Sequence, residues 1–314
     1  MGPLMQRIST LALLTSLAVC SAQTTVETKR VSRAAALPVG VEVLHAVEIG
    51  TGGGRTLRAE IARPTRAPSS PLPAVLWIHG GGWSGGSHLD NRALDLAARG
   101  YFTASIEYRL TGEAPWPAQI EDCKLGVRWL RANAARYHVN PDRIGVWGAS
   151  AGGHLVACLG TMGDEAQFEG TGGYPGVSSR VRAVVDFCGP SDFTGHATSE
   201  PGGFSADPPA LLALFGVPST KNPERWAAAS PIRHVSDDDA AFLFVHGDRD
   251  SMVPIEQSQK LARDLKQAGV PVEFITVKGG GHNMAAAPGQ PPALPDRKTL
   301  DAAVLKFFDR QLKK

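Results

Sequence analysis

Ser150 has the sequence context of a nucleophile, because residues 148–152 follow the pattern G-x-S-x-G. An apolar, β-branched run ends at Gly148, and an apolar segment able to form a helix begins at residue 155. A serine in a sharp turn between a strand and a helix needs small flanking residues, because a Cβ atom at Gly148 or Gly152 would collide with neighbouring backbone. The pattern alone fits either a nucleophile or an ordinary turn of small residues. A base and an acid elsewhere in the chain would favour the nucleophile.

A base and an acid for this serine are present further along the chain. A serine hydroxyl is a weak nucleophile at neutral pH and needs both groups. His282 lies in a glycine-rich loop after the last expected strand, and Asp248 and Asp250 follow the preceding strand. Alone, His282 fits a solvated loop histidine and each aspartate fits a turn. The chain order Ser, Asp, His after successive strands instead predicts a catalytic triad, with Ser150 as nucleophile and His282 as base.

Residues 79–83, which read His-Gly-Gly-Gly-Trp, are the expected source of hydrogen-bond donors for an oxyanion. The glycines allow the backbone N–H groups of Gly81 and Gly82 to point into a site, and the N–H of Ala151 adds a third donor. The alternative is a plain glycine turn after a strand. Trp83 is expected either to line the acyl pocket as a substrate-binding residue or to pack beneath a cap.

The elements that must position these residues follow from the hydrophobic pattern. Partial alternation over 41–49 and 56–62, around a glycine turn, predicts an antiparallel hairpin. Further strands and helices alternate along the chain, which predicts an α/β fold with a mainly parallel, doubly wound sheet. The expected strands are 74–78, 101–108, 181–188, 241–245 and 272–277, with one more before Ser150, and the expected helices are 91–99, 117–138, 255–268 and 297–312. Residues 195–231 are rich in Pro, Gly and Ala and predict a small cap insertion over the carboxyl edge of the sheet.

Composition limits the class of protein. The chain has 314 residues, of which 43% are hydrophobic, so it can bury a large core, and one domain over 39–314 is expected. The 32 basic and 30 acidic residues leave a net charge of +2, which argues against nucleic acid as a partner. The histidines lack metal-ligand spacing, so neither a metal nor a cofactor is expected. Cys123, Cys158 and Cys188 allow at most one disulfide and are expected as buried small hydrophobes.

The N-terminus has the features of a secretory signal peptide over residues 1–22. Arg7 supplies a positive charge, residues 8–19 are apolar, and small residues follow at 20–22. The apolar run is too short to cross a bilayer, so we expect no transmembrane segment and a secreted or periplasmic protein. Lipoprotein anchoring at Cys20 is the alternative, although Val19 fits a lipobox poorly. A loose mature N-terminus is expected over residues 23–38.

The combined motifs resemble those of the α/β-hydrolase superfamily, in particular HGGG-type lipases and esterases such as bacterial feruloyl- and acetylxylan-esterase-like proteins. The resemblance rests on residues 79–83, 148–154, 246–254 and 281–282 and extends over roughly 41–312. In that family the acid is the aspartate of H-G-x-x-D-x-x-V-P, which corresponds to Asp250 and ranks it above Asp248. The resemblance implies an α/β-hydrolase fold and a serine esterase that forms an acyl-enzyme. The implied substrates are short-acyl or aryl esters, such as polysaccharide side-chain esters.

Two other functions remain open from the sequence. An arylformamidase-like amidase would use the same groups on a different bond, although a secretory leader argues against cytosolic metabolism. A non-catalytic binding module on a hydrolase fold would usually lack a triad member, and all three are present.

His154 follows the nucleophile closely, but we expect it to point along the helix away from Ser150 and to be structural. Arg109 and Asp122 are expected to form an internal charge pair.

Overall fold

The computed structural model describes residues 2, 37–66, 68–194 and 207–313. Apart from residues 2, 37 and 38, the predicted signal peptide and the predicted loose N-terminus lie outside these residues, as does Cys20. From Leu37 onward the chain forms one compact unit. Within the described residues, no helix is both long enough and apolar enough to cross a membrane.

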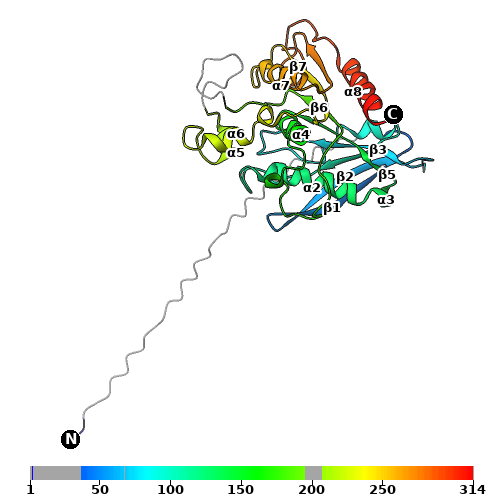
Figure 1. The fold of residues 1–314 in the computed structure, drawn as a ribbon, viewed down its shortest axis with the longest axis horizontal. Helices are drawn as coiled ribbons and strands as arrows, with labels where there is room; N and C mark the ends of the chain where they lie inside the picture. The colour runs from blue at the N-terminus through cyan, green and yellow to red at the C-terminus, as the bar shows by residue number, and fades with distance from the viewer. Residues whose placement is uncertain (1, 3–36, 67, 195–206, 314) are drawn as a thin grey trace. The chain divides into compact units, whose positions relative to one another are not determined.

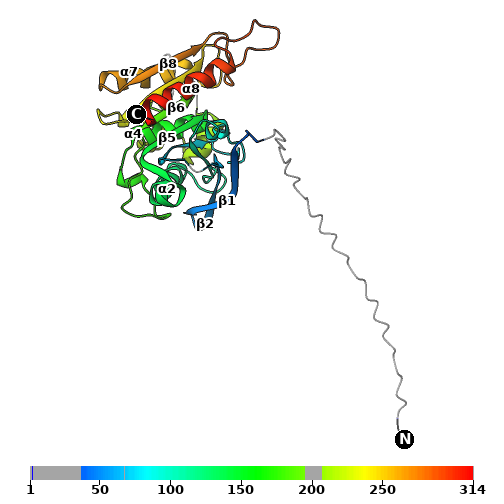
Figure 2. The same ribbon diagram turned by 90° about the vertical axis from the view of Figure 1, so that its right-hand side faces the viewer.

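Within the described residues, eight strands form a single sheet in the order β1-β2-β4-β3-β5-β6-β7-β8 (Figure 1). β2 pairs antiparallel with β1 and with β4, and all other pairings are parallel. The strands are β1 Val41–Gly52, β2 Arg55–Pro64, β3 Leu72–Ile78, β4 Phe102–Ile106, β5 Val139–Ala149, β6 Ala183–Phe187, β7 Ala241–Gly247 and β8 Val272–Val277. The expected hairpin and the mainly parallel sheet are therefore confirmed. Figure 2 shows the hairpin and β8 at opposite ends of the sheet, as the strand order requires.

The sheet has a hydrophobic core on each face. β3, β6 and β7 are buried along their whole length, as central strands between two helical layers should be. Successive residues of β3 divide between the faces: Leu76 joins a core with helices α2, α4 and α7, and Trp77 joins a core with α8. Those helices span Ala118–Ala132 (α2), Ala151–Thr161 (α4), Ile255–Gln267 (α7) and Arg297–Leu312 (α8).

Two predicted helices differ in the structure. The helix expected over 91–99 is a single turn, α1 (Leu94–Ala97), because the side chain of Asn91 accepts a 3.0 Å hydrogen bond from the Ala93 N–H and forms a turn instead. The helix expected over 117–138 breaks at Asn133, between α2 and the short α3 (Ala134–Tyr137). The Asn133 amide donates to the carbonyl of Trp129 at 2.8 Å, which satisfies an end carbonyl of α2.

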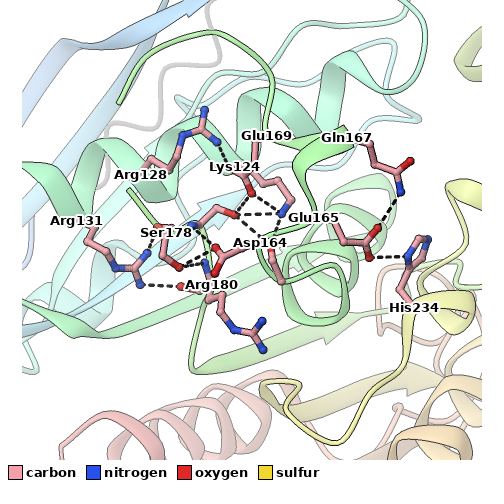
Figure 3. Close-up of polar contacts among 12 residues, drawn as sticks. Lys124, Arg128, Arg131, Asp164, Glu165, Gln167, Glu169, Ser178, Arg180 and His234 are labelled. Atoms are coloured by element: carbon pink, nitrogen blue, oxygen red, sulfur yellow. Dashed lines mark hydrogen bonds and ion pairs between the residues drawn. The ribbon is translucent and has the colours of Figure 1, made fainter. Parts of the chain in front are cut away.

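A network of buried charges fastens the connection between α4 and β6 to helix α2 (Figure 3). Lys124 is fully buried and donates to Glu169 Oε1 at 2.9 Å and to Ser179 Oγ at 3.0 Å. Arg128, which is 3% exposed, pairs with the other oxygen of Glu169. Two buried cations therefore share one carboxylate, and they fix a connection between two elements that flank the site.

The cap predicted over 195–231 is described only from residue 207. It contains α5 (Pro209–Phe215) and α6 (Pro223–Ala228), followed by the short 3₁₀ helix η2 (Pro231–His234). The rings of Phe215 and Trp226 lie 4.2 Å apart in its buried face. A Cβ placed on Gly82 would lie 3.8 Å from the Cβ of Ala210, so α5 borders the predicted oxyanion loop.

Candidate active site

Ser150 occupies a strained turn between β5 and α4. Its backbone angles are φ 58° and ψ −122°, a conformation that a residue with a side chain rarely adopts. A Cβ on Gly148 would lie 2.3 Å from the Gly152 carbonyl oxygen, and a Cβ on Gly152 would lie 2.2 Å from that of Ile78. Both glycines are therefore required for the close approach of strand and helix that presents the hydroxyl.

His282 and Asp250 converge on this serine. The Nε2 atom of His282 lies 2.9 Å from Ser150 Oγ, and its Nδ1 atom lies 2.7 Å from Asp250 Oδ2. An ionised carboxylate only accepts hydrogen bonds, so Nδ1 donates to Asp250 and Nε2 is left free to accept the serine proton. The three predicted triad residues thus lie in the order and tautomer that general-base catalysis needs.

The surroundings of Asp250 keep it ionised. Its side chain is fully buried, and its Oδ1 atom accepts the N–H groups of Met252 at 2.9 Å and Val253 at 3.0 Å. Burial opposes ionisation, but the hydrogen bonds from His246, His282 and Val253 outweigh it and hold the pKa of Asp250 well below its usual range. The buried carboxylate is therefore negative throughout the neutral range.

Asp248 lies in the same loop but has a different role in the structure. Its Oδ1 atom accepts the N–H of Gly279 at 2.7 Å, while its own N–H donates to the carbonyl of Val277. Asp248 thus braces the start of the loop that carries His282. Of the two aspartates considered from the sequence, Asp250 is the one in contact with the imidazole.

The predicted oxyanion segment lies directly beside the nucleophile. A Cβ on Gly80 would lie 3.3 Å from the Cβ of Ser150. Gly81 and Gly82 have φ of +115° and +60°, which glycine adopts without steric cost. Among the described residues, no acceptor is recorded for the backbone N–H groups of Gly81, Gly82 or Ala151. Within that part of the chain, the three N–H groups predicted as oxyanion donors therefore have no competing acceptor.

Trp83 and His154 link the oxyanion segment to the cap. Trp83 is 4% exposed, and its indole N–H donates to His154 Nδ1 at 3.2 Å. His154 Nε2 in turn donates to the carbonyl of Ala229 at 2.8 Å. Burial lowers the pKa of His154 to about 4, so the ring is neutral. The structural role expected for His154 is confirmed, whereas substrate contact by Trp83 stays a prediction.

His246 contacts the acid of the predicted triad, a contact that the sequence did not predict. It lies at the end of β7, is fully buried, and places Nε2 at 3.2 Å from Asp250 Oδ2. In the sequence it is the first residue of the H-G-x-x-D-x-x-V-P motif, which served there to choose Asp250 as the acid. The expected pair of Arg109 and Asp122 is confirmed elsewhere, with Nε and Oδ2 at 2.8 Å.

Among the described residues, one group has three candidate metal-ligating atoms within 4.8 Å of one another: Cys188, Asp250 and His282. Burial raises the pKa of the Cys188 thiol well above its usual value, and the thiol donates to the His282 carbonyl at 3.2 Å. Metals bind the thiolate, and His282 Nδ1 is already bonded to Asp250. The donor set therefore fits a hydrogen-bonded triad better than a metal centre. Cys123, Cys158 and Cys188 are all buried free thiols, as expected.

Comparison of the sequence with known proteins identifies relatives that are named as esterases. Esterase LipC of Mycobacterium tuberculosis is 32% identical over 234 residues, which cover 71% of this chain and 56% of LipC. The probable carboxylic ester hydrolase LipM of the same organism is 31% identical over 213 residues, covering 65% of this chain and 47% of LipM. The chain thus spans about half the length of the curated relatives it matches.

Solved structures share the fold over most of the chain. A truncated carbohydrate esterase from gut microbiota superposes with a TM-score of 0.75 at 29% identity, covering 87% of this chain and 97% of that one. The thermophilic esterase Est2 of Thermogutta terrifontis gives a TM-score of 0.69 at 26% identity, covering 87% and 92%. These similarities confirm the expected α/β-hydrolase fold. Residues 60–265, more than half of the chain, match the BD-FAE family model, and the chain therefore belongs to the BD-FAE family.

Proposed function

We propose that this protein is a serine carboxylic ester hydrolase. The observation that carries the proposal is the continuous hydrogen-bonded series from Ser150 Oγ to His282 Nε2 at 2.9 Å, and from His282 Nδ1 to Asp250 Oδ2 at 2.7 Å. The esterases among the relatives and structural neighbours support the same activity.

Acylation of the enzyme begins at Ser150. His282 Nε2 takes the hydroxyl proton while Oγ attacks the acyl carbon of the ester. The tetrahedral oxyanion that forms accepts hydrogen bonds from the N–H groups of Gly81, Gly82 and Ala151. His282 then gives its proton to the alcohol oxygen, the C–O bond of the ester breaks, and the acyl group remains on Ser150.

Deacylation repeats these steps with water. His282 takes a proton from water as the water oxygen attacks the acyl carbon, and the same N–H groups bind the second oxyanion. The bond to Ser150 Oγ breaks, Oγ takes the proton from His282, and the carboxylic acid is released. Asp250 stays ionised throughout and stabilises the imidazolium form of His282.

The proposed substrates are short-acyl or aryl esters, including esters on polysaccharide side chains. Support comes from the carbohydrate esterase neighbour, which this chain covers over 97% of its length. Secretion through a signal peptide at residues 1–22 is part of the same proposal, because an extracellular enzyme reaches polysaccharide esters directly.

Replacement of the nucleophile tests the activity. We expect Ser150→Ala to lower kcat for p-nitrophenyl acetate by about 10⁵- to 10⁶-fold and to abolish labelling by a fluorophosphonate probe. Retention of most of the hydrolysis by this variant would refute the mechanism. A failure of the wild-type protein to label would instead indicate a binding module.

The substrate class needs a second set of measurements. Acetyl, butyryl and feruloyl esters, acetylated xylan and N-formylkynurenine would be compared by kcat/KM with the wild-type protein. We expect the short-acyl or aryl esters to give the highest values. A higher value for N-formylkynurenine would identify an arylformamidase-like amidase instead.

A further inference from the structure

Asp250 lies between two imidazoles, only one of which belongs to the triad. Its Oδ2 atom is 2.7 Å from His282 Nδ1 and 3.2 Å from His246 Nε2. The side chains of His246 and Asp250 are both fully buried, so water does not compete for these contacts. If Asp250 is the catalytic acid proposed above, His246 is in direct contact with it.

The partners of His246 determine where its proton lies. Nε2 faces two acceptors, the Val253 carbonyl at 2.9 Å and Asp250 Oδ2, so Nε2 carries the hydrogen. Nδ1 lies 2.8 Å from the hydroxyl of Ser258 on α7, which is also fully buried. Within the described part of the chain, Nδ1 is the hydrogen-bond partner of this hydroxyl, so the hydroxyl hydrogen points to Nδ1. A charged ring would leave the buried hydroxyl hydrogen without an acceptor, so the geometry favours a neutral His246 that donates from Nε2.

We propose that His246, held in this tautomer by Ser258, is a positioning residue that orients Asp250 and withdraws negative charge from its Oδ2 atom. The series of side-chain contacts then runs from Ser258 through His246, Asp250 and His282 to Ser150. The proposal rests on the esterase function and extends it by two residues that do not touch the substrate.

Two further ionisable groups near this series are Asp186 on β6 and Cys188, the residue after that strand. Asp186 is fully buried on β6, and its Oδ1 atom accepts the Gly189 N–H at 2.8 Å. Cys188 carries a neutral thiol bonded to the His282 carbonyl. Among the described residues, the side-chain nitrogens that contact Asp250 Oδ2 are His282 Nδ1 at 2.7 Å and His246 Nε2 at 3.2 Å, the second shared with the Val253 carbonyl. Loss of His246 leaves His282 as the imidazole partner of that oxygen.

Loss of the His246 donor has two expected consequences for catalysis. Oδ2 becomes more basic and holds the imidazolium form of His282 more strongly, so the rise of kcat/KM with pH moves to higher pH. The carboxylate also loses a contact that fixes its orientation, which lowers kcat.

The test compares two replacements in the full chain. His246→Leu removes the donor, whereas His246→Gln keeps an N–H at similar reach. We expect the Leu variant to lose about 10- to 100-fold in kcat with little change in KM, and its pH profile to move upward. The Gln variant should retain most of the activity and the wild-type profile. Equal losses in both variants, with an unmoved profile, would show that His246 only fills space and would overturn the proposal.

Ser258→Ala keeps the proposal testable if His246→Leu does not fold. It leaves the imidazole in place but removes the group that fixes its tautomer, so we expect a smaller shift in the same direction. A profile identical to the wild type would overturn the role of Ser258. The wild-type and Ser150→Ala proteins separate this failure from failure of the esterase function: an inactive wild-type protein refutes the function, whereas normal Ser150-dependent activity in His246→Leu refutes the inference alone.

Discussion

Asp250 Oδ2 lies 2.7 Å from the Nδ1 atom of His282, although 32 positions separate the two residues in the chain. Asp248, two residues earlier, instead accepts the Gly279 N–H at 2.7 Å. The same loop therefore carries two carboxylates. That of Asp250 contacts the imidazole of His282, and that of Asp248 accepts a backbone hydrogen bond from the loop that carries His282.

Replacing each carboxylate by an amide separates their roles. Asp250→Asn can present an N–H to His282 and favours the wrong tautomer, so we expect kcat for p-nitrophenyl acetate to fall by about 10⁴-fold. Asp248→Asn keeps an oxygen for the Gly279 N–H, and its kcat should stay within about threefold of the wild type. A larger loss in the Asp248 variant than in the Asp250 variant would reverse the assignment of the acid.

Gly81 and Gly82 differ in the space available for a side chain. A Cβ on Gly81 would lie 2.5 Å from the Gly85 carbonyl oxygen, so Gly81→Ala must move the backbone and should lower kcat by about 100-fold. A Cβ on Gly82 would have its nearest atoms 3.8 Å away, so an alanine there meets no steric clash. Its one cost is the left-handed backbone conformation, about 1 kcal/mol. We therefore expect Gly82→Ala to lose less than about tenfold in kcat. Similar losses in the two variants would contradict this steric account.

The neutral, buried His154 makes stability depend on pH. Its pKa is about 4 in the folded protein and 6.5 when exposed, so the unfolded chain binds a proton that the folded one does not as the pH falls from about 6.5 to about 4. His154 does not change the free energy of unfolding above pH 6.5, and below pH 4 it lowers that free energy by about 3 kcal/mol. Urea unfolding should show His154→Asn losing less stability over this interval than the wild type. Parallel curves for the two proteins would contradict a buried neutral ring.

Glu169 is the shared counter-ion of two buried cations. Glu169→Gln leaves Lys124 and Arg128 without a negative partner, so we expect the free energy of unfolding at neutral pH to fall by about 3 kcal/mol. Asp301→Asn is the matched control, because Asp301 pairs with Arg297 on the surface of α8 and its loss should cost less than about 0.5 kcal/mol. A cost as small as that of the control would show that Glu169 is dispensable.

The sequence predicted Ser150, His282 and the loop of the acid because chain order and strand ends are both readable from it, whereas the choice of Asp250 over Asp248 came from the resemblance to the α/β-hydrolase motif. Ser150, Asp250 and His282 each follow an apolar strand, and parallel strands bring their carboxyl ends to one edge of the sheet. The hairpin turn was predictable for a similar local reason. Gly53 and Gly54 have φ of +57° and +81°, the conformation that a two-residue hairpin loop demands.

Other features depend on contacts that periodicity does not encode. Lys124 and Arg128 are charged residues of α2 that would be expected on its solvent-exposed face. They are buried because the loop that contains Glu169 packs over them and supplies a carboxylate. The break at Asn133 depends on a side-chain hydrogen bond that competes with the helix. The contact between His246 and Asp250 depends on how the loop after β7 folds back against that strand, which periodicity does not show.

The close packing around the turn that carries Ser150 has a consequence for the order in which the protein folds. Gly152 fits against the Ile78 carbonyl only when α4 is already docked on β3, and the positive φ of Ser150 is sustained only by such neighbours. The isolated segment would relax to an ordinary conformation with no exposed hydroxyl. We therefore expect hydrolytic activity to return late during refolding, after the helical signal has recovered, because partly folded chains lack a correctly presented nucleophile.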